Sequence, residues 1–527
     1  MKMNLATDPW IPVVWQNGQP GMVSLADAFQ GSEEIQDLAV CPHERIALTR
    51  LLLCIAQAAL DGPTDHPDWQ TCRPRIAPAA ADYLRRWRHA FELFGDKQRF
   101  LQVANLRPVI KADDDEDEGN SVSKLDLALA TGNNSTLFDN AGGSARSFTP
   151  AQVALMLLTH QCFSPCGTIG VALWNNKPTL GWSSYPKVRP GQSEHAPCLA
   201  GNMLHSIMRG AALIETLHLN MLTRQTVALL TGCNSWGKPV WESMPGSPDD
   251  DAAIHNSIAT YLGRLVPISR ALRLDEDAAT MLRANGLKYP PYDLWREPAC
   301  TIVVRRRKDQ SERAVLGASL DRAPWRELHA LTVRRVGRDT NGGPVALQNV
   351  PDNEPFDLWV GALIAAGNGK LEDVVEAVFH VPANMLTDTG QRNYEDGVGH
   401  AQELANRLGR AVLAYRKELG DDLTRREARD QATKVRNKAA AHYWTDIEQG
   451  VQRLLEVVDD PASLTGDNGW PRTIWGRACW TAALRAFDAA CPHTTPRQMR
   501  AFALARQLLF RSIQPHNFQG KPQEAET

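Results

Sequence analysis

The chain has 527 residues, of which 43% are hydrophobic and 22% charged, and its formal net charge at pH 7 is −3. This composition is typical of a folded globular protein of about two to four domains, and it excludes a disordered tail or a disulfide-stapled mini-protein. The slight negative charge excludes a uniformly basic surface. The protein can therefore bind nucleic acid only through local basic patches or with the help of partner molecules.

The chain shows no targeting or membrane segment. Its first residues, MKMNLATDPWIPVVW, lack the apolar core of a signal peptide, and no stretch approaches the roughly 18 uninterrupted apolar residues of a membrane span. Ten cysteines are scattered without the spacing of a disulfide framework. We therefore expect a cytoplasmic protein with reduced thiols and no membrane partner.

The first elements are a hairpin and helices. The apolar run from Trp10 to Trp15 leads into Gln16-Asn17-Gly18, and Asn-Gly between apolar runs favours a β-hairpin. Residues 42–60, rich in Leu and Ala, predict a helix, as do residues 83–94. The acidic run at residues 113–118 predicts an exposed loop, because six like charges repel one another.

A polar loop and a capped helix come next. Residues 131–143, TGNNSTLFDNAGG, predict a loop. Ser147 or Thr149 is expected to cap a helix that begins with Pro150 and runs to about residue 161. A glycine-punctuated stretch follows at residues 167–170, and then a helix is predicted over residues 201–221.

The second half divides near Pro355. Strands are predicted over residues 301–304, 314–318 and 331–336, whereas helical spacing dominates after residue 355, with helices expected over 356–364 and from 371 onwards. We therefore predict an α+β fold. A large irregular mixed domain occupies residues 1–355, and an all-α four-helix bundle occupies residues 356–527.

Motifs for catalysis or metal binding are weak. The sequence has no phosphate-binding P-loop, no G-x-S-x-G and no H-E-x-x-H. Cys162 and Cys166 form half of a zinc pattern without a second close pair, and His442 lies in an aromatic context that favours a structural role. We therefore expect neither an enzyme, nor a metal, nor any other cofactor.

Two segments concentrate positive charge. Residues 301–338 hold ten basic residues against four acidic ones, and residues 401–444 hold ten against six. Lys and Arg at such density favour contact with phosphates, although a charged helix face is often simply solvated. The second segment supplies the candidates Arg425, Arg426, Arg429, Lys434, Arg436 and Lys438.

The loop at residues 365–370 allows two interpretations. Gly367 and Gly369 lack side chains, so the main chain can approach a partner closely, while Asn368 offers an amide and Lys370 a charge. One interpretation is a probe of the DNA minor groove. The other is an ordinary helix C-cap followed by a turn.

Four segments carry a resemblance to a known family. DPWIPV, TGNNSTLFDN, SFTPAQVALMLLTHQ and RGAALIETLHLNML, with WRELHALTVRR and the helical C-terminus in the same order, resemble the CasA family of type I-E CRISPR–Cas systems over most of the chain. The resemblance implies a non-catalytic large subunit of Cascade, a crRNA-guided surveillance complex. Such a subunit would recognise the protospacer-adjacent motif in duplex DNA, assist strand opening and R-loop formation, and dock a helicase–nuclease.

The resemblance also implies roles for particular segments and partners. The motif-binding residues would be Ala365, Ala366, Gly367, Asn368, Gly369 and Lys370, joined by Lys288. A DNA-proximal glycine loop would contain Gly167 and Gly170. The loop that faces the crRNA handle and its subunit would include Asn133, Asn134, Thr136, Leu137 and Phe138. The partners would be double-stranded target DNA, the backbone, handle-binding and small subunits that carry crRNA, and the helicase–nuclease.

Two alternatives stay open from the sequence. One is a nuclease whose site follows none of the familiar motifs. The other is a structural subunit that holds its neighbours together and never contacts DNA. In the family some members hold zinc with two close cysteine pairs, and Cys162 and Cys166 match half of that pattern, so no zinc site is expected.

Overall fold

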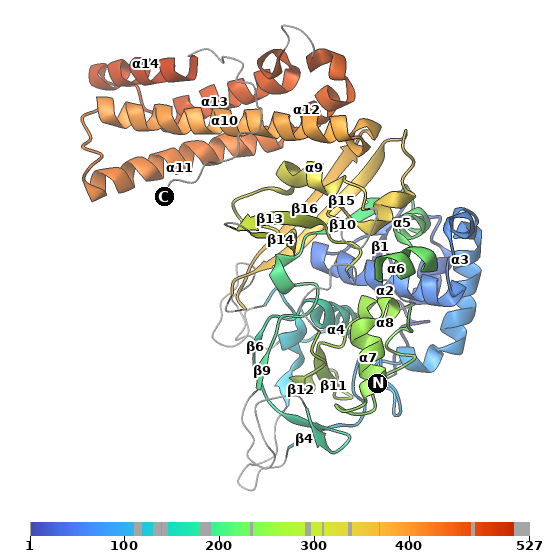
Figure 1. The fold of residues 1–527 in the computed structure, drawn as a ribbon. Helices are drawn as coiled ribbons and strands as arrows, with labels where there is room; N and C mark the ends of the chain where they lie inside the picture. Colours follow the sequence, from blue (N-terminus) through green and yellow to red (C-terminus); the bar gives the residue numbers. More distant parts are fainter. Residues whose placement is uncertain are drawn as a thin grey trace. The chain divides into compact units, whose positions relative to one another are not determined.

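The computed structural model describes residues 2–109, 119–129, 139, 146–179, 191–231, 236–289, 297–307, 310–335, 340–367, 369–464 and 469–510. The chain forms two compact units (Figure 1). The first comprises residues 1–324, 330–351 and 356–379, and the second residues 325–329, 352–355 and 380–527. The first mixes small antiparallel sheets with helices and the second is helical, which confirms the predicted α+β class. The first unit extends beyond the boundary that we placed after residue 355.

The N-terminal hairpin and the following helix agree with the prediction. Strand β1 (Ile11–Trp15) pairs with β2 (Pro20–Val23) on one side and with β3 (Ile35–Leu38) on the other. Helix α2 (Pro42–Leu60) is buried over most of its length, so it forms a central element of the first unit. The helix predicted over residues 83–94 is only partly present, because α3 (His66–Arg86) ends within it and a 3-10 helix (Arg88–Phe91) follows.

A buried ion cluster connects α2 to distant segments. Arg50 on α2 donates to Glu297 (2.8 Å) and to the carbonyl oxygens of Leu265 and Arg264, and Arg264 donates to the same carboxylate at 3.0 Å. Burial alone would raise the pKa of Glu297, but the two guanidinium groups outweigh it and hold the pKa below its ordinary value. Glu297 is therefore an ionised carboxylate that neutralises two buried cations.

Replacing Glu297 with Gln should destabilise the chain by about 3–5 kcal/mol, because two buried guanidinium groups would lose their counter-charge. Denaturant-induced unfolding followed by tryptophan fluorescence would measure the loss. Glu276→Gln is the control, since Glu276 is exposed, and it should change stability by less than about 0.5 kcal/mol. Equal stability of the two variants would contradict the role assigned to Glu297.

Helix α4 (Pro150–Phe163) begins as predicted. The Thr149 side chain accepts a hydrogen bond from the backbone N–H of Gln152, and Pro150 occupies the first turn. Near its end, Gln161 donates to the carbonyl oxygens of Leu101 and Arg270. Arg270 opens strand β11 (Arg270–Leu274), which pairs with β12 (Thr280–Asn285).

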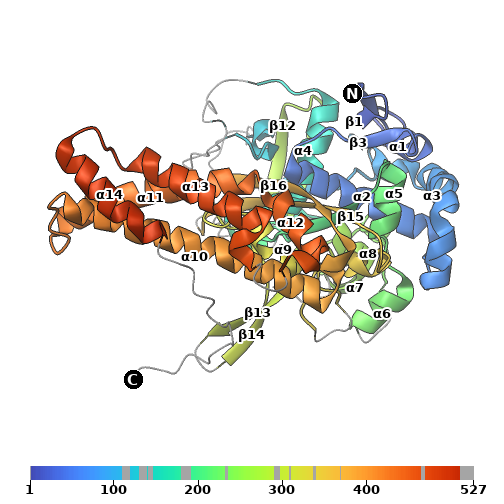
Figure 2. The same cartoon turned by 90° about the horizontal axis from the view of Figure 1, so that it is seen from above.

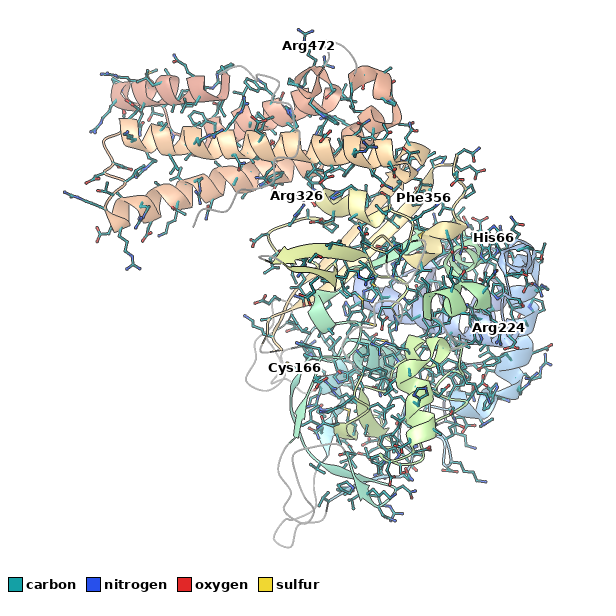
Figure 3. All side chains as sticks on the ribbon, viewed as in Figure 1. His66, Cys166, Arg224, Arg326, Phe356 and Arg472 are labelled. Atoms are coloured by element: carbon teal, nitrogen blue, oxygen red, sulfur yellow. The ribbon has the colours of Figure 1, made fainter. Side chains whose placement is uncertain are left out.

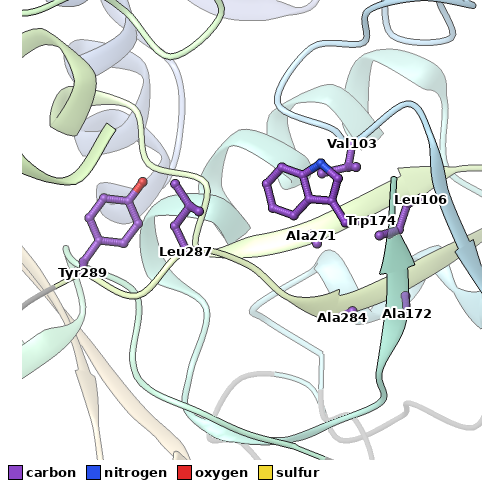
Figure 4. Packing of buried hydrophobic residues seen from close by; sticks show 8 residues of the cluster. All are labelled: Val103, Leu106, Ala172, Trp174, Ala271, Ala284, Leu287 and Tyr289. Carbon is purple, nitrogen blue, oxygen red and sulfur yellow. The ribbon is translucent and has the colours of Figure 1, made fainter. Parts of the chain in front are cut away.

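A hydrophobic cluster underlies these strands (Figure 4). Val103, Leu106, Ala172, Trp174, Ala271, Ala284, Leu287 and Tyr289 make up this cluster. It joins β4 (Leu106–Pro108) and β7 (Ala172–Trp174) to β11 and β12. The Tyr289 hydroxyl also accepts a hydrogen bond from the Ile268 N–H at 2.7 Å. Because Leu287 and Tyr289 are buried in it, the cluster fixes the backbone on both sides of Lys288.

The segment after Pro355 forms strands, so the helices predicted over residues 356–364 and from 371 are wrong. Strand β15 (Phe356–Ala365) lies between β10 (His205–Arg209) and β16 (Leu371–Val381) in an antiparallel sheet. Residues 358–364 are all buried in β15. A continuous apolar run of this length does not by itself distinguish a buried strand from a buried helix, and here sheet pairing decides.

Other predictions for the first unit met different outcomes. The strands β13 (Ile302–Arg307) and β14 (Gln310–Val315) pair with each other and overlap two predicted strands. The helix predicted over residues 201–221 is wrong in its first half, where β10 pairs with β15, and correct in its second half, α5 (Leu213–Asn220). No strand covers the described residues 331–335, since α9 (Leu328–Leu331) ends there.

The remaining short elements connect these parts. They are α1 (Leu25–Gln30), α6 (Arg224–Thr231), α7 (Asp251–Ala259), α8 (Tyr261–Leu265), β5 (Asn120–Ser121), β6 (Gly167–Ile169), β8 (Lys177–Pro178) and β9 (Gly191–Ser193).

The second unit is a bundle of long helices, as predicted (Figures 1 and 2). The helices α10 (Asp388–Glu418), α11 (Arg426–Glu448), α13 (Ile474–Ala490) and α14 (Pro496–Phe510) run alongside one another, and the shorter α12 (Val451–Asp459) packs against α10 and α13. The predicted apolar face of α10, which includes Leu404 and Tyr415, is buried. Among the described residues, no helix is both long and apolar enough to cross a membrane.

Candidate nucleic-acid interface

Residues 365–370 form the tight turn of the β15–β16 hairpin, so the alternative of a helix C-cap is wrong. The Ala366 N–H donates to the Lys370 carbonyl oxygen (2.8 Å), and the Gly369 N–H donates to the Ala366 carbonyl oxygen (2.9 Å). The Ala365 N–H donates to the side chain of Asn202 at 2.9 Å. Asn368 lies outside the described residues. The turn is therefore held on both sides of its tip by the backbone of its own hairpin.

The two glycines of this turn differ in what surrounds them. Gly369 is buried with φ +83°, and a Cβ added there would lie 2.6 Å from the carbonyl oxygen of Cys166. Gly367 is exposed and has open space where a Cβ would project. Ala365, Ala366 and Lys370 are half-buried. Gly369 thus packs the turn against the protein, while Gly367 presents bare main chain to solvent.

The glycine stretch at residues 167–170 contacts the same turn. The Sγ atom of Cys166 lies 4.0 Å from the Gly367 carbonyl oxygen, and Figure 3 marks Cys166 where β6 begins. Residues 167–169, predicted as part of a loop, form β6, which pairs with β9. Gly167 and Gly170 are both exposed, with open space around the Cβ position. Two segments about 200 residues apart in sequence therefore expose main chain side by side.

Lys288 belongs to the same region through Glu194. Its side chain is 66% exposed, and its Nζ atom lies 4.0 Å from Glu194 Oε1, directly after β9. An exposed ion pair of this length contributes little energy, so the ammonium group is available to an anionic partner. The hairpin turn, the glycine strand and Lys288, to which the resemblance assigned DNA binding, are thus linked through Cys166 and Glu194.

Arg270 holds the base of this surface together. Its side chain donates to the carbonyl oxygens of Pro165 (2.8 Å), Glu194 (2.9 Å) and Ser269 (2.8 Å). Arg270 is 4% exposed, and of the residues that the structure describes no carboxylate pairs with it. Burial, and then repulsion from Arg283, lowers the pKa of Arg270 to about 9. The buried guanidinium group of Arg270 therefore adds to the positive electrostatic potential of the surface above it.

His195 completes this support from the other side. Its Nδ1 atom accepts a hydrogen bond from the Cys166 N–H at 3.1 Å, which requires a neutral ring nitrogen. Burial, and then the neighbouring Arg270, lowers the pKa of His195 and favours that neutral form. Nothing in the sequence pointed to His195 or Arg270, because neither lies in a recognisable motif.

The six cations predicted to contact the DNA backbone belong to the second unit. Arg425 precedes α11, and the other five lie on it; all six are exposed. Arg425 pairs with Asp422 (3.3 Å) and Arg426 with Asp430 (3.9 Å), whereas Arg429, Lys434, Arg436 and Lys438 have no ion pair among the described residues. The side chain of Arg436 lies along Gly409 of α10. These cations are thus exposed at the start of α11 and along the helix.

The predicted handle-facing residues Asn133, Asn134, Thr136, Leu137 and Phe138 lie outside the described residues. Leu129 and Asp139, on either side of them, form a β-bridge, and Asp139 pairs with Arg146 at 2.6 Å. As for metals, no group of three or more His, Cys, Asp or Glu side chains in the described ranges is arranged to hold an ion. Cys162 is buried against the backbone of Cys198.

Comparisons with known proteins agree with this architecture. The family described as CRISPR-associated protein Cse1 matches residues 4–486. A CRISPR-associated protein CasA/Cse1 of Thermus thermophilus is 27% identical over 96% of both chains. The crystal structure of Cse1 from Acidimicrobium ferrooxidans has a TM-score of 0.74 at 21% identity, covering 97% of both chains. A chain of a structure described as a CRISPR RNA-guided surveillance complex has a TM-score of 0.71 at 19% identity, covering 97% of this chain and 99% of that one.

A mixed α+β unit, a helical bundle and a match over nearly the whole length define a CRISPR-associated protein. Within that class, the chain belongs to the Cse1 family, also called CasA.

The contrast between the two turn glycines gives a direct test. Gly369→Ala should destabilise the hairpin by about 1–2 kcal/mol from its left-handed backbone alone, and the added Cβ would also displace Cys166. Gly367→Ala, its matched control, should change stability by less than about 0.5 kcal/mol. Thermal unfolding and hydrogen exchange at residues 165–170 would measure both. If Gly367→Ala proved as disruptive as Gly369→Ala, the described packing would be incorrect.

Removing the Arg270 guanidinium should loosen the glycine strand. In Arg270→Met three carbonyl oxygens lose their donor, so we expect the amides of residues 166–169 to exchange about tenfold faster. Arg273→Met, on the same strand but partly exposed, is the control and should leave these amides unchanged. Hydrogen exchange read by mass spectrometry measures both variants. Unaltered exchange in Arg270→Met would remove Arg270 from the support of this surface.

Proposed function

We propose that this chain is the large subunit of a crRNA-guided Cascade surveillance complex and recognises a protospacer-adjacent motif in duplex DNA. Membership of the Cse1 family supports this, as does the likeness to a chain of a CRISPR RNA-guided surveillance complex. In such complexes base pairing reads the target sequence, and the protein needs to read only a short motif. A net charge of −3 suits a subunit that shares DNA binding with RNA-bearing partners.

One observation carries the proposal: exposed glycine backbone and an exposed lysine belong to the same region of the first unit. Gly367, Gly167 and Gly170 present backbone without side chains, and Lys288 adds charge beside them. The DNA minor groove is about 6 Å wide and displays few distinguishing groups. A side-chain-poor surface can approach its floor closely, and a lysine can reach a base acceptor or a phosphate. Reading of this kind would tolerate several related motifs.

The hairpin also suits a role in strand opening. Its turn connects two strands of a three-stranded sheet, and this sheet makes the hairpin rigid enough to insert against a duplex. Small apolar residues such as Ala365 and Ala366 can stack against a disturbed base step better than charged ones. Opening of the duplex next to the motif would let crRNA pairing begin and the R-loop extend.

The other surfaces complete the proposal. The exposed cations of α11 would bind DNA phosphates, and residues 133–138 would face the crRNA handle and its subunit. Further surface would dock the helicase–nuclease that cuts the target. The chain itself would supply no catalytic group, which fits a family whose members act as parts of an assembly.

Alanine at both Asn368 and Lys370 should weaken motif-dependent DNA binding of the reconstituted complex by about 10- to 100-fold, because one base-edge contact and one charge are lost. Mobility-shift titration against duplexes with correct and scrambled motifs measures the effect. Lys238→Ala, an exposed lysine elsewhere in the first unit, is the control and should bind like the wild type.

The same titration separates the alternatives. Unchanged binding by the Asn368/Lys370 variant would remove the turn from recognition and favour a purely structural subunit. Cutting of labelled DNA by the isolated chain with Mg²⁺ would favour a nuclease instead.

A further inference from the structure

A groove on the helical bundle gathers arginines that the DNA proposal does not use. It lies between the end of α11, the start of α12 and the outer face of α13, and its volume is about 500 Å³. Arg453, Arg477 and Arg485 line it, whereas Asp446 is its single acidic residue. All three arginines are exposed, and within the part of the chain that the structure describes none forms an ion pair. The groove therefore has a net positive charge, since three arginines face one acidic residue.

The helices set the spacing of these charges. Arg477 and Arg485 are eight residues apart on α13, which corresponds to about 12 Å along the helix axis. Thr481, midway between them, adds a hydroxyl group to the same face. In an extended peptide, side chains four positions apart lie on the same side, about 13 Å from one another. Two carboxylates at that spacing could meet both guanidinium groups at once, each through two hydrogen bonds.

The rest of the lining favours a protein segment over a nucleic acid strand. Ile474 is 39% exposed at the groove, and the small residues Ala478 and Ala482 leave room beside it. An apolar side chain of a peptide would cover Ile474, while a sugar–phosphate backbone would gain nothing there. Asp446 would repel carboxylates and phosphates alike, but it can accept a hydrogen bond from a peptide N–H, a donor that a sugar–phosphate backbone lacks. The first turn of α12 also lacks an acidic side chain, so no residue of that turn neutralises the positive end of the helix dipole.

We infer that this groove binds an extended acidic segment of a partner protein, with two carboxylates four residues apart and an apolar side chain just outside the carboxylate that meets Arg477. Arg477 and Arg485 take the carboxylates, Arg453 adds charge from α12, and Ile474 packs against the apolar side chain. The inference concerns a protein contact of the bundle, and it stands whether or not the hairpin turn reads DNA.

Fluorescence anisotropy with the purified full-length chain tests the inference. The probe is a labelled peptide of about nine residues with two glutamates four positions apart and a leucine two positions outside each glutamate, compared with the same peptide carrying glutamines. At about 50 mM salt, where screening is weak, the acidic peptide should bind at least about tenfold more tightly than the glutamine peptide. The double variant Arg477→Glu/Arg485→Glu should lose at least about tenfold in affinity. Arg500→Glu, an exposed arginine on α14, should bind the probe like the wild type.

The outcomes are decisive in both directions. Loss of peptide binding in the double variant, with unchanged circular dichroism and with binding kept in Arg500→Glu, would support the groove as an acidic-segment site. Equal binding by the double variant and the wild type, or no preference for the acidic peptide, would overturn it. So would a labelled single-stranded oligonucleotide that binds the wild type more tightly than the peptide and is lost in the double variant, because the groove would then be a nucleic-acid site.

Discussion

The candidate DNA-binding surface depends on one buried guanidinium group. Arg270 donates to carbonyl oxygens of Pro165 and Glu194, which belong to segments 105 and 76 residues away in sequence. Its lowered pKa shows that holding a cation there costs free energy, since no carboxylate in the described ranges compensates it. That cost is consistent with a role for Arg270 in holding the segments of Pro165 and Glu194 in place. Besides the pairing of β6 with β9 and the hydrogen bond from Cys166 to His195, Arg270 is the side chain that joins these two segments to β11.

A second buried cluster stabilises the unit on which this surface is built. Arg50, Arg264 and Glu297 join the central helix α2 to two other segments, with each guanidinium hydrogen-bonded to the carboxylate and to a backbone carbonyl. Buried charges of this kind are tolerated when their hydrogen bonds are complete. The two clusters differ in character: one is a neutralised ion group at the centre, and the other is a lone cation just below the surface. Only the second has no carboxylate partner among the described residues.

Local signals in the sequence predicted the elements that are determined locally. Asn17-Gly18 indicated the first hairpin, Thr149 and Pro150 marked the start of α4, and the apolar spacing of α10 indicated the bundle. The β15–β16 hairpin was missed because its apolar run is equally suited to a buried helix, and its pairing with β10 involves residues about 150 positions away. The turn, the glycines and Lys288 were selected through family resemblance. The roles of Arg270 and His195 could not be predicted, because their hydrogen bonds join segments that are far apart in the sequence.

The burial of Leu287 and Tyr289 on either side of Lys288 constrains how this surface can change over time. A single residue inserted or deleted between Asn285, where β12 ends, and Tyr289 would turn the lysine toward the hydrophobic cluster and the tyrosine ring toward water. The identity of the side chain at position 288 can therefore vary, while the length of the chain leading to it cannot. Among relatives, or in engineered forms with new motif preferences, diversity at this position is expected through replacement of the side chain in a backbone of fixed length.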